Sequence, residues 1–284
     1  MAKRRKRRKT LIFGSVVGLP VAFLGLLFLE SQLAAGGPKL PEEVYALDGR
    51  VEPLVLDGTA PPHPLRIAWM GDSTAAGVGA SSAEHALPRL VAKGLGRPVE
   101  LRSFAISGAR VDDVLEKQLP LLLAIPTEDF PEFVVIDVGA NDVTHLTNVN
   151  GFRSSYLGIL DKIPESASVI VLGVPDLGSV TRLAQPLRFV AGVRGGTYDA
   201  VVEAMRDQGA DYVNIADFTG PKFRADPDQY LAGDNYHASD AGYQLWADTV
   251  IPVIRWRLFK REHPNEPEPL QPKEAKGTVK GNAP

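Results

Sequence analysis

The chain of 284 residues contains no cysteine. That absence excludes disulfide bonds, thiolate metal sites, cysteine nucleophiles and a lipid-modified N-terminal cysteine. Histidine is scarce, with five residues, and no group of His, Asp and Glu has the spacing of metal ligands, so we expect no metal site. We expect no cofactor either, because the sequence has no phosphate-binding glycine loop and no zinc-protease helix motif.

Positive charge is sparse outside the N-terminus. Seven of the first nine residues are Lys or Arg, and the rest of the chain carries 24 basic against 34 acidic residues, a net charge of −10. An acidic domain disfavours nucleic acid as a partner. The hydrophobic content of 44% and charged content of 23% are typical of a globular protein.

An uncharged apolar run, Leu11–Leu29, follows the basic cluster. A helix of that length spans roughly 28 Å, close to the hydrocarbon thickness of a bilayer. We therefore expect residues 1–9 to form a basic cytoplasmic segment and residues 10–30 a transmembrane signal anchor, with the rest of the chain outside the cytoplasm. The alternative is a signal peptide cleaved near Ala34-Ala35-Gly36, which would release a secreted protein.

Two further segments are predicted to lie outside a folded domain. Residues 31–64 contain several Gly and Pro residues and are predicted to form a linker, with one short strand near 51–56. Residues 261–284 are rich in Pro, Glu and Lys and are predicted to be a disordered tail.

Residues 65–260 alternate short apolar runs with helical patterns. The predicted strands are 65–70, 99–104, 133–138, 168–173 and 212–215, and the predicted helices are 83–95, 111–122, 151–162, 198–208 and 239–258. Five strands that alternate with helices predict an α/β domain, a three-layer α/β/α sandwich around a five-stranded parallel sheet.

Four short motifs lie at the ends of these elements. Gly71-Asp72-Ser73, Ser107-Gly108 and Gly139-Ala140-Asn141-Asp142 follow the first three strands, and Asp234-Asn235-Tyr236-His237 precedes the last helix. Taken singly, each is commonly a turn or a helix cap. Because the carboxyl ends of parallel strands meet at one edge, where ligands bind, the combination indicates a functional site.

The residue types in these motifs suit acyl transfer. A serine hydroxyl such as that of Ser73 needs a base within hydrogen-bond reach, and His237 is of the right type. Asp234 could orient the imidazole of His237. Candidate donors for an oxyanion are the Ser73 and Gly108 backbone N–H groups and the Asn141 side-chain amide.

With these motifs the sequence resembles the SGNH hydrolases, also called the GDSL esterase/lipase family, over roughly residues 65–258. The resemblance implies a flavodoxin-like sheet and ester hydrolysis through an acyl-enzyme. It implies catalytic roles for Ser73, Asp234 and His237, and an oxyanion hole of Ser73, Gly108 and Asn141. Thr74 departs from the family, which often has leucine there. The absence of a Gly-x-Ser-x-Gly elbow argues against the α/β-hydrolase fold.

We therefore predict a membrane-anchored serine esterase or lipase that acts on a small-molecule or lipid ester. The alternatives are an acyltransferase or deacetylase acting on envelope glycans, and a non-catalytic binding module on the same fold. His85 and His145 lie near the predicted site, where each either lines the surface or contacts substrate. Residues 174–197 are expected to form a pocket wall or lid, whose Arg182, Arg188 and Arg194 either meet an anionic head group or are solvated surface charges.

Overall fold

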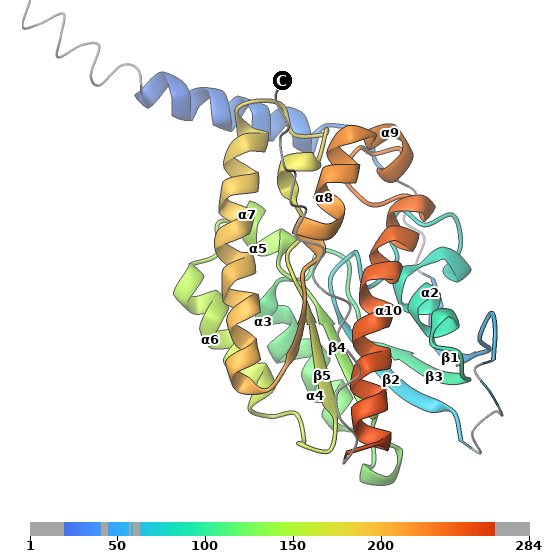
Figure 1. The fold of residues 1–284 in the computed structure, drawn as a ribbon. Coiled ribbons are helices and arrows are strands. Elements are labelled where there is room, and N and C mark those ends of the chain that lie inside the picture. The colour runs from blue at the N-terminus through green and yellow to red at the C-terminus, as the bar shows by residue number, and fades with distance from the viewer. Residues whose placement is uncertain (1–19, 41–44, 57, 59–62, 265–284) are drawn as a thin grey trace, which may run out of the picture.

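The computed structural model describes residues 20–40, 45–56, 58 and 63–264. Within them lies a six-stranded sheet of order β1-β3-β2-β4-β5-β6 (Figure 1). Strands β2 to β6 pair in parallel, and β1 pairs antiparallel with β3. The strands are β1 (Gly49–Val51), β2 (Leu65–Gly71), β3 (Val99–Ser103), β4 (Phe133–Asp137), β5 (Ser168–Leu172) and β6 (Asp211–Val213).

The five predicted strands are confirmed, but the prediction of a wholly parallel five-stranded sheet is wrong. Strand β1 makes the sheet mixed, because the outer edge of β3 presents backbone N–H and C=O groups that β1 pairs. It comes from the part of the chain predicted as a linker, where Leu47 and Val51 are buried in the core. The short strand predicted near 51–56 lies earlier, at Gly49–Val51, and overlaps the prediction only at Val51, because Pro53 has no N–H to donate to a strand partner.

The central strands are buried on both faces. In β2, Ile67 and Trp69 belong to one apolar cluster, whereas Ala68 and Met70 belong to the other. Alternate residues of a strand point to opposite faces, so a strand covered on both sides reads as a continuous apolar run. This pattern made the strands recognisable in the sequence.

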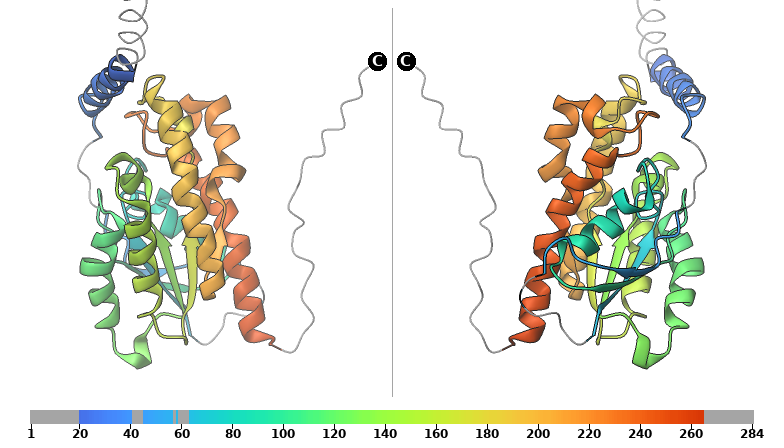
Figure 2. Two further views of the ribbon diagram at one scale, coloured as in Figure 1. Left: turned by 90° about the vertical axis from the view of Figure 1, so that its left-hand side faces the viewer. Right: turned by 90° about the vertical axis from the view of Figure 1, so that its right-hand side faces the viewer.

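Helices cover both faces of the sheet and form the predicted three layers (Figures 1 and 2). Side chains of α2, α8 and α10 join one cluster, and those of α3, α4, α6 and α7 join the other. The helices are α2 (Leu87–Gly94), α3 (Val111–Asp113), α4 (Leu119–Leu123), α5 (Ala140–Thr144), α6 (Val149–Leu160), α7 (Leu187–Glu203), α8 (Ile215–Ala225), α9 (Pro227–Tyr230) and α10 (Asp240–Glu262).

The described part of the chain begins with a helix over residues 20–35, which lies across the first turn of α7 (Figure 1). No helix within the described ranges is long and apolar enough to cross a membrane. The predicted transmembrane helix of residues 10–30 therefore finds no support there, and its residues 10–19, like the basic segment 1–9, lie outside the description. Residues 265–284 of the predicted tail lie outside it as well.

Candidate active site

Ser73 lies just beyond the carboxyl end of β2, where the strand passes into a tight turn. Gly71 allows this, because a Cβ atom there would collide with the main-chain carbonyl of Asp137 on β4. The buried side chain of Gln118 holds the strand end by accepting from Gly71 N at 2.7 Å and donating to Gly71 O at 2.8 Å. Asp72 Oδ1 then accepts from Thr74 N at 2.9 Å, which closes the turn around Ser73.

The structure brings Ser73, His237 and Asp234 into one line of hydrogen bonds. His237 Nε2 lies 3.0 Å from Ser73 Oγ, and His237 Nδ1 lies 2.7 Å from Asp234 Oδ2. Because an ionised carboxylate only accepts, Nδ1 carries the proton and Nε2 is left as the acceptor for the serine hydroxyl. Ser73 and His237 are 164 positions apart in the sequence, so the fold brings them together.

Asp234 is anchored in the turn that carries His237. Its Oδ1 accepts from the backbone N–H groups of Tyr236 and His237, each at 3.0 Å. Burial works to raise the pKa of Asp234, but the hydrogen bonds from His237 and Tyr236 outweigh burial and hold that pKa below its usual value. The carboxylate therefore stays ionised and can stabilise a protonated His237.

The two remaining predicted residues are placed differently. Asn141, in the first turn of α5, lines the same pocket as Ser73 and His237. Gly108 is exposed in the loop after β3, with a φ of +80° that favours glycine, and it does not line that pocket. The Asn141 amide donates to the carbonyl of Ala109 at 3.0 Å, which fixes the Gly108 turn beside α5.

A buried pair of carboxyl groups lies beneath the turn. Burial raises the pKa of Asp72 to about 6, against a hydrogen bond from Thr74 and the charge of His237. Burial and the neighbouring Asp72 charge raise the pKa of Asp137 well above its usual value. Asp137 Oδ2 finds no hydrogen-bond partner among the described residues, which fits a protonated acid at this strand end.

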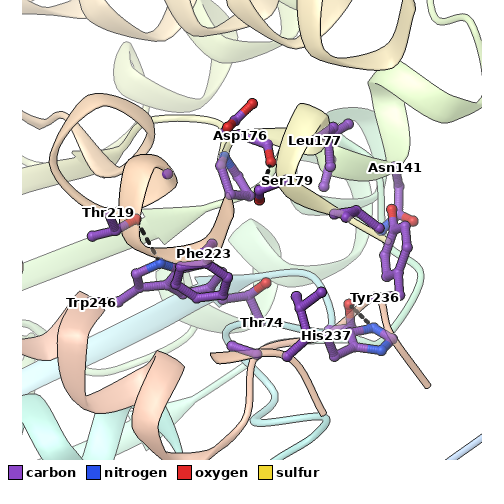
Figure 3. Close-up of a pocket in the computed structure, with 17 residues that line it drawn as sticks. Thr74, Asn141, Asp176, Leu177, Ser179, Thr219, Phe223, Tyr236, His237 and Trp246 are labelled. Atoms are coloured by element: carbon purple, nitrogen blue, oxygen red, sulfur yellow. Dashed lines mark hydrogen bonds between the residues drawn. The ribbon is translucent and has the colours of Figure 1, made fainter. Parts of the chain in front are cut away.

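The pocket runs from the Ser73–His237 pair inward between the loop after β5, α8 and α10. Apolar side chains line its depth, and Phe223 and Trp246 lie at the end away from His237 and Tyr236 (Figure 3). These two rings stack with centroids 5.5 Å apart, and Trp246 Nε1 donates to Thr219 Oγ1 at 3.0 Å. The pocket opens to solvent and has a cavity volume of about 40 Å³, enough for roughly three water-sized groups.

Other residues considered in the sequence lie outside this pocket. His85 is exposed and contacts Ser81 and Ser82, and His145 Nδ1 lies 2.9 Å from Asn141 O. Arg194 donates to the carbonyls of Val143 and Thr147 and so braces α5 from within the protein. Among the described residues, no three His, Cys, Asp or Glu side chains lie close enough to hold a metal ion.

The residues 174–197 divide between two roles. The first part lines the pocket, as expected of a wall, through Pro175, Asp176, Leu177, Ser179 and Val180. The later part belongs to α7, which begins at Leu187. None of the three arginines in this segment lines the pocket. The sequence did not predict that Gln118 holds the end of β2, or that Thr219, Phe223 and Trp246 line the pocket. Only long-range contacts connect these residues to Ser73.

Comparison with known proteins shows which family and which fold the chain is similar to. The profile of the GDSL-like lipase/acylhydrolase family matches residues 69–245. A GDSL-like esterase of Mycobacterium tuberculosis is 32% identical over 206 residues, which are 70% of this chain and 65% of that protein. The match therefore spans slightly less than two thirds of the relative's length.

Solved structures with similar folds carry related names. A lipase/acylhydrolase from Enterococcus faecalis superposes with a TM-score of 0.53 at 22% identity, covering 68% of this chain and 96% of that one. A lipase from a goat rumen metagenome gives a TM-score of 0.52 at 17% identity, covering 66% and 97%. At such identities the likeness concerns the fold.

Proposed function

Because the chain belongs to the GDSL-like lipase/acylhydrolase family, we propose that it is a serine hydrolase that cleaves carboxylic esters. One observation carries the proposal, namely the line of two hydrogen bonds that joins Ser73 Oγ through His237 to Asp234, at 3.0 and 2.7 Å. An uncharged serine needs this arrangement to become a nucleophile near neutral pH.

The proposed reaction gives each of these atoms a role. Ser73 Oγ attacks the ester carbonyl carbon while its proton passes to His237 Nε2, and Asp234 stabilises the imidazolium. The groups proposed to donate to the oxyanion are the Ser73 N–H and the Asn141 amide, which line the pocket, and the Gly108 N–H of the adjacent loop, which does not line it. His237 returns the proton to the leaving alcohol oxygen. A water molecule then attacks the acyl-enzyme by the same proton transfers and releases the acid and free Ser73.

The pocket favours esters with a short acyl chain. Its cavity volume of about 40 Å³ has room for only a few heavy atoms, and the stacked rings of Phe223 and Trp246 lie at its far end. Its lining is largely apolar, which suits an alkyl group rather than a charged one.

We further propose that the N-terminal segment holds the catalytic domain at the outer face of a cell membrane. The run Leu11–Leu29 is uncharged and follows seven basic residues. Where this run is described, large apolar side chains are exposed on several sides of the helix; they are Val21, Phe23, Leu24, Leu26, Phe28 and Leu29. Apolar side chains all round a helix are typical of burial in a membrane or a protein core. Alkaline carbonate extraction tests this: full-length protein in the soluble fraction would overturn the anchor.

A fluorophosphonate probe tests the catalytic proposal. The full-length protein is expected to be labelled and to hydrolyse p-nitrophenyl acetate, because the probe reacts with activated serine hydroxyls. The Ser73→Ala variant is expected to lose both properties. Ser166→Ala, which alters an exposed serine before β5, is the matched control and should keep both.

Two results would contradict the proposal. An unlabelled wild-type protein would indicate a binding module, and a labelled Ser73→Ala variant would place the nucleophile elsewhere. Repeating the assay with a sugar acceptor distinguishes the two chemistries of an acyl-enzyme. Water capture gives free acid, whereas a transferase would form the acylated sugar.

A further inference from the structure

Arg182 connects the N-terminal helix to the catalytic domain. Its Nε donates to the carbonyl of Ala34 at 2.7 Å, and a terminal nitrogen donates to the carbonyl of Pro38 at 2.5 Å. One turn earlier on the same face, the helix of residues 20–35 is also held by the buried Glu30, whose carboxylate accepts from the first backbone N–H of α7, that of Leu187, at 2.9 Å. The helix is therefore fastened at two points to the active-site end of the domain.

The same arginine faces the acid of the Ser73–His237–Asp234 line. The terminal nitrogen that binds Pro38 lies 3.8 Å from Asp234 Oδ2, the oxygen that accepts from His237. The Arg182 backbone N–H also donates at 2.9 Å to the carbonyl of Asn235, a non-glycine residue with a φ of +59°. The Asp234 side chain is 3% exposed and that of Arg182 is 15% exposed, so solvent screens this ion pair poorly.

We propose that Arg182 is a positioning residue, which clamps the helix of residues 20–35 onto the domain and holds the Asp234 carboxylate in register with His237. The planar guanidinium suits this role, since its fixed fork of donors can bind two carbonyls and face a carboxylate at once. The N-terminal helix thereby becomes part of the active-site framework, and a change in its docking alters catalysis. This inference rests on the proposed ester hydrolysis.

Kinetics of the full-length protein test the link to Asp234. Arg182→Gln is expected to lower kcat on p-nitrophenyl acetate about 10- to 100-fold with KM nearly unchanged, because a misplaced base slows the chemical step rather than substrate binding. Arg182→Lys keeps the charge but not the fork, so its kcat should lie between those of Arg182→Gln and the wild type. Arg153→Gln, an exposed arginine on α6, should behave as the wild type.

Distance measurements test the docking itself. Because the chain has no cysteine, spin labels can be attached at Leu33→Cys on the helix and Val193→Cys on α7, both exposed. The distance distribution should be narrow in the parent and broad in Arg182→Gln. Glu30→Ala loosens the helix without touching Asp234, so it should broaden the distribution and also lower kcat.

Each outcome separates the possibilities. An unchanged kcat in Arg182→Gln, or a loosened helix with full kcat in Glu30→Ala, would overturn the coupling. A narrow distribution in Arg182→Gln would overturn the clamp. If the wild type neither hydrolyses the ester nor reacts with the fluorophosphonate, the proposed function fails instead, while the distances still test the clamp. If Arg182→Gln is unfolded under the assay conditions, Glu30→Ala and Arg182→Lys provide the test instead.

Discussion

Gly71 and Gln118 determine, at the scale of single residues, where Ser73 stands. Gly71 has no room for a side chain, and Gln118 binds both of its backbone groups from 47 positions away in the sequence. Gln118 is fully buried, so its amide has no water to bind and depends on the backbone of Gly71 for its hydrogen bonds. A buried side-chain amide that binds a single strand end both stabilises the fold and fixes the start of the Ser73 turn.

Gln118→Ala is expected to lower the free energy of unfolding by about 2–4 kcal/mol, because Gly71 N–H is left buried without an acceptor and a small cavity forms. We also expect kcat to fall about tenfold as Ser73 shifts. Urea denaturation and ester hydrolysis measure the two effects. Gln244→Ala on the exposed face of α10 is the control, and equal stability of the two variants would contradict the prediction.

Asn141 offers a second test at this scale. Its amide lines the pocket with Ser73 and His237, where it can donate to an oxyanion. Asn141→Ala is expected to lower kcat about 10²- to 10³-fold with KM within about threefold, because the interaction strengthens only in the transition state. Asn150→Ala, an exposed position on α6, should leave both constants unchanged. A wild-type kcat in Asn141→Ala would remove this residue from the oxyanion hole.

At the scale of elements, strands were easier to predict than helices. The runs 65–70 and 133–138 match β2 and β4 within a residue at each end, because strands buried on both faces are continuously apolar. Helix α7 was predicted from residue 198 but begins at Leu187, since Gly192, Gly195 and Gly196 weaken the helical signal. Helix α8 was not predicted, because its Gly220 and Pro221 likewise weaken the helical signal.

The candidate site divides in a similar way. Ser73, Asn141, Asp234 and His237 could be singled out because each belongs to a short motif next to a predicted element. Gln118 and the pocket residues stand in no such motif, and their positions depend on how helices pack across the sheet. Local sequence thus indicates the candidate catalytic groups, whereas the groups that hold and surround them follow from tertiary contacts.

The packing of α8 against α10 gives a prediction about substrate choice. Phe223→Ala removes a ring that is 3% exposed and stacks on Trp246 at the pocket end. We expect the preferred acyl chain of p-nitrophenyl esters to lengthen by several carbons, with a loss of about 3–5 kcal/mol in the free energy of unfolding. Phe218→Ala changes the same residue type on the exposed side of α8 and should keep the short-chain preference. An unaltered preference in Phe223→Ala would contradict the assignment of the pocket.

At the scale of the whole molecule, carboxyl groups with shifted pKa values determine how stability depends on pH. Two sets of carboxyl groups act in opposite directions: burial foremost raises the pKa of Asp72, Asp137, Asp142 and Asp199, whereas hydrogen bonds and nearby charges lower the pKa of Glu84, Asp113 and Asp234. The lowered set stabilises the fold above the usual carboxyl range and loses that effect as pH falls through it. The raised set binds protons more tightly in the folded state, so its contribution declines as pH rises above the usual carboxyl range, which for Asp72 means from about 4 through about 6. Stability should therefore be greatest in mildly acidic solution.

Asp72→Asn tests this balance. Asp72 has a pKa of about 6 in the fold against the usual 3.8, which corresponds to a loss of about 3 kcal/mol of stability between about pH 4 and pH 7. Asparagine keeps the oxygen that accepts from Thr74 N but never ionises, and it removes the charge that raises the pKa of Asp137. Urea denaturation at pH 4, 5, 6 and 7 should give a falling free energy of unfolding for the wild type and a flatter curve for Asp72→Asn. Asp161→Asn, at an exposed position after α6, should follow the wild type. If wild-type stability instead rises steadily from pH 4 to pH 7, the acids beneath Ser73 are paired in a way that these contacts do not include.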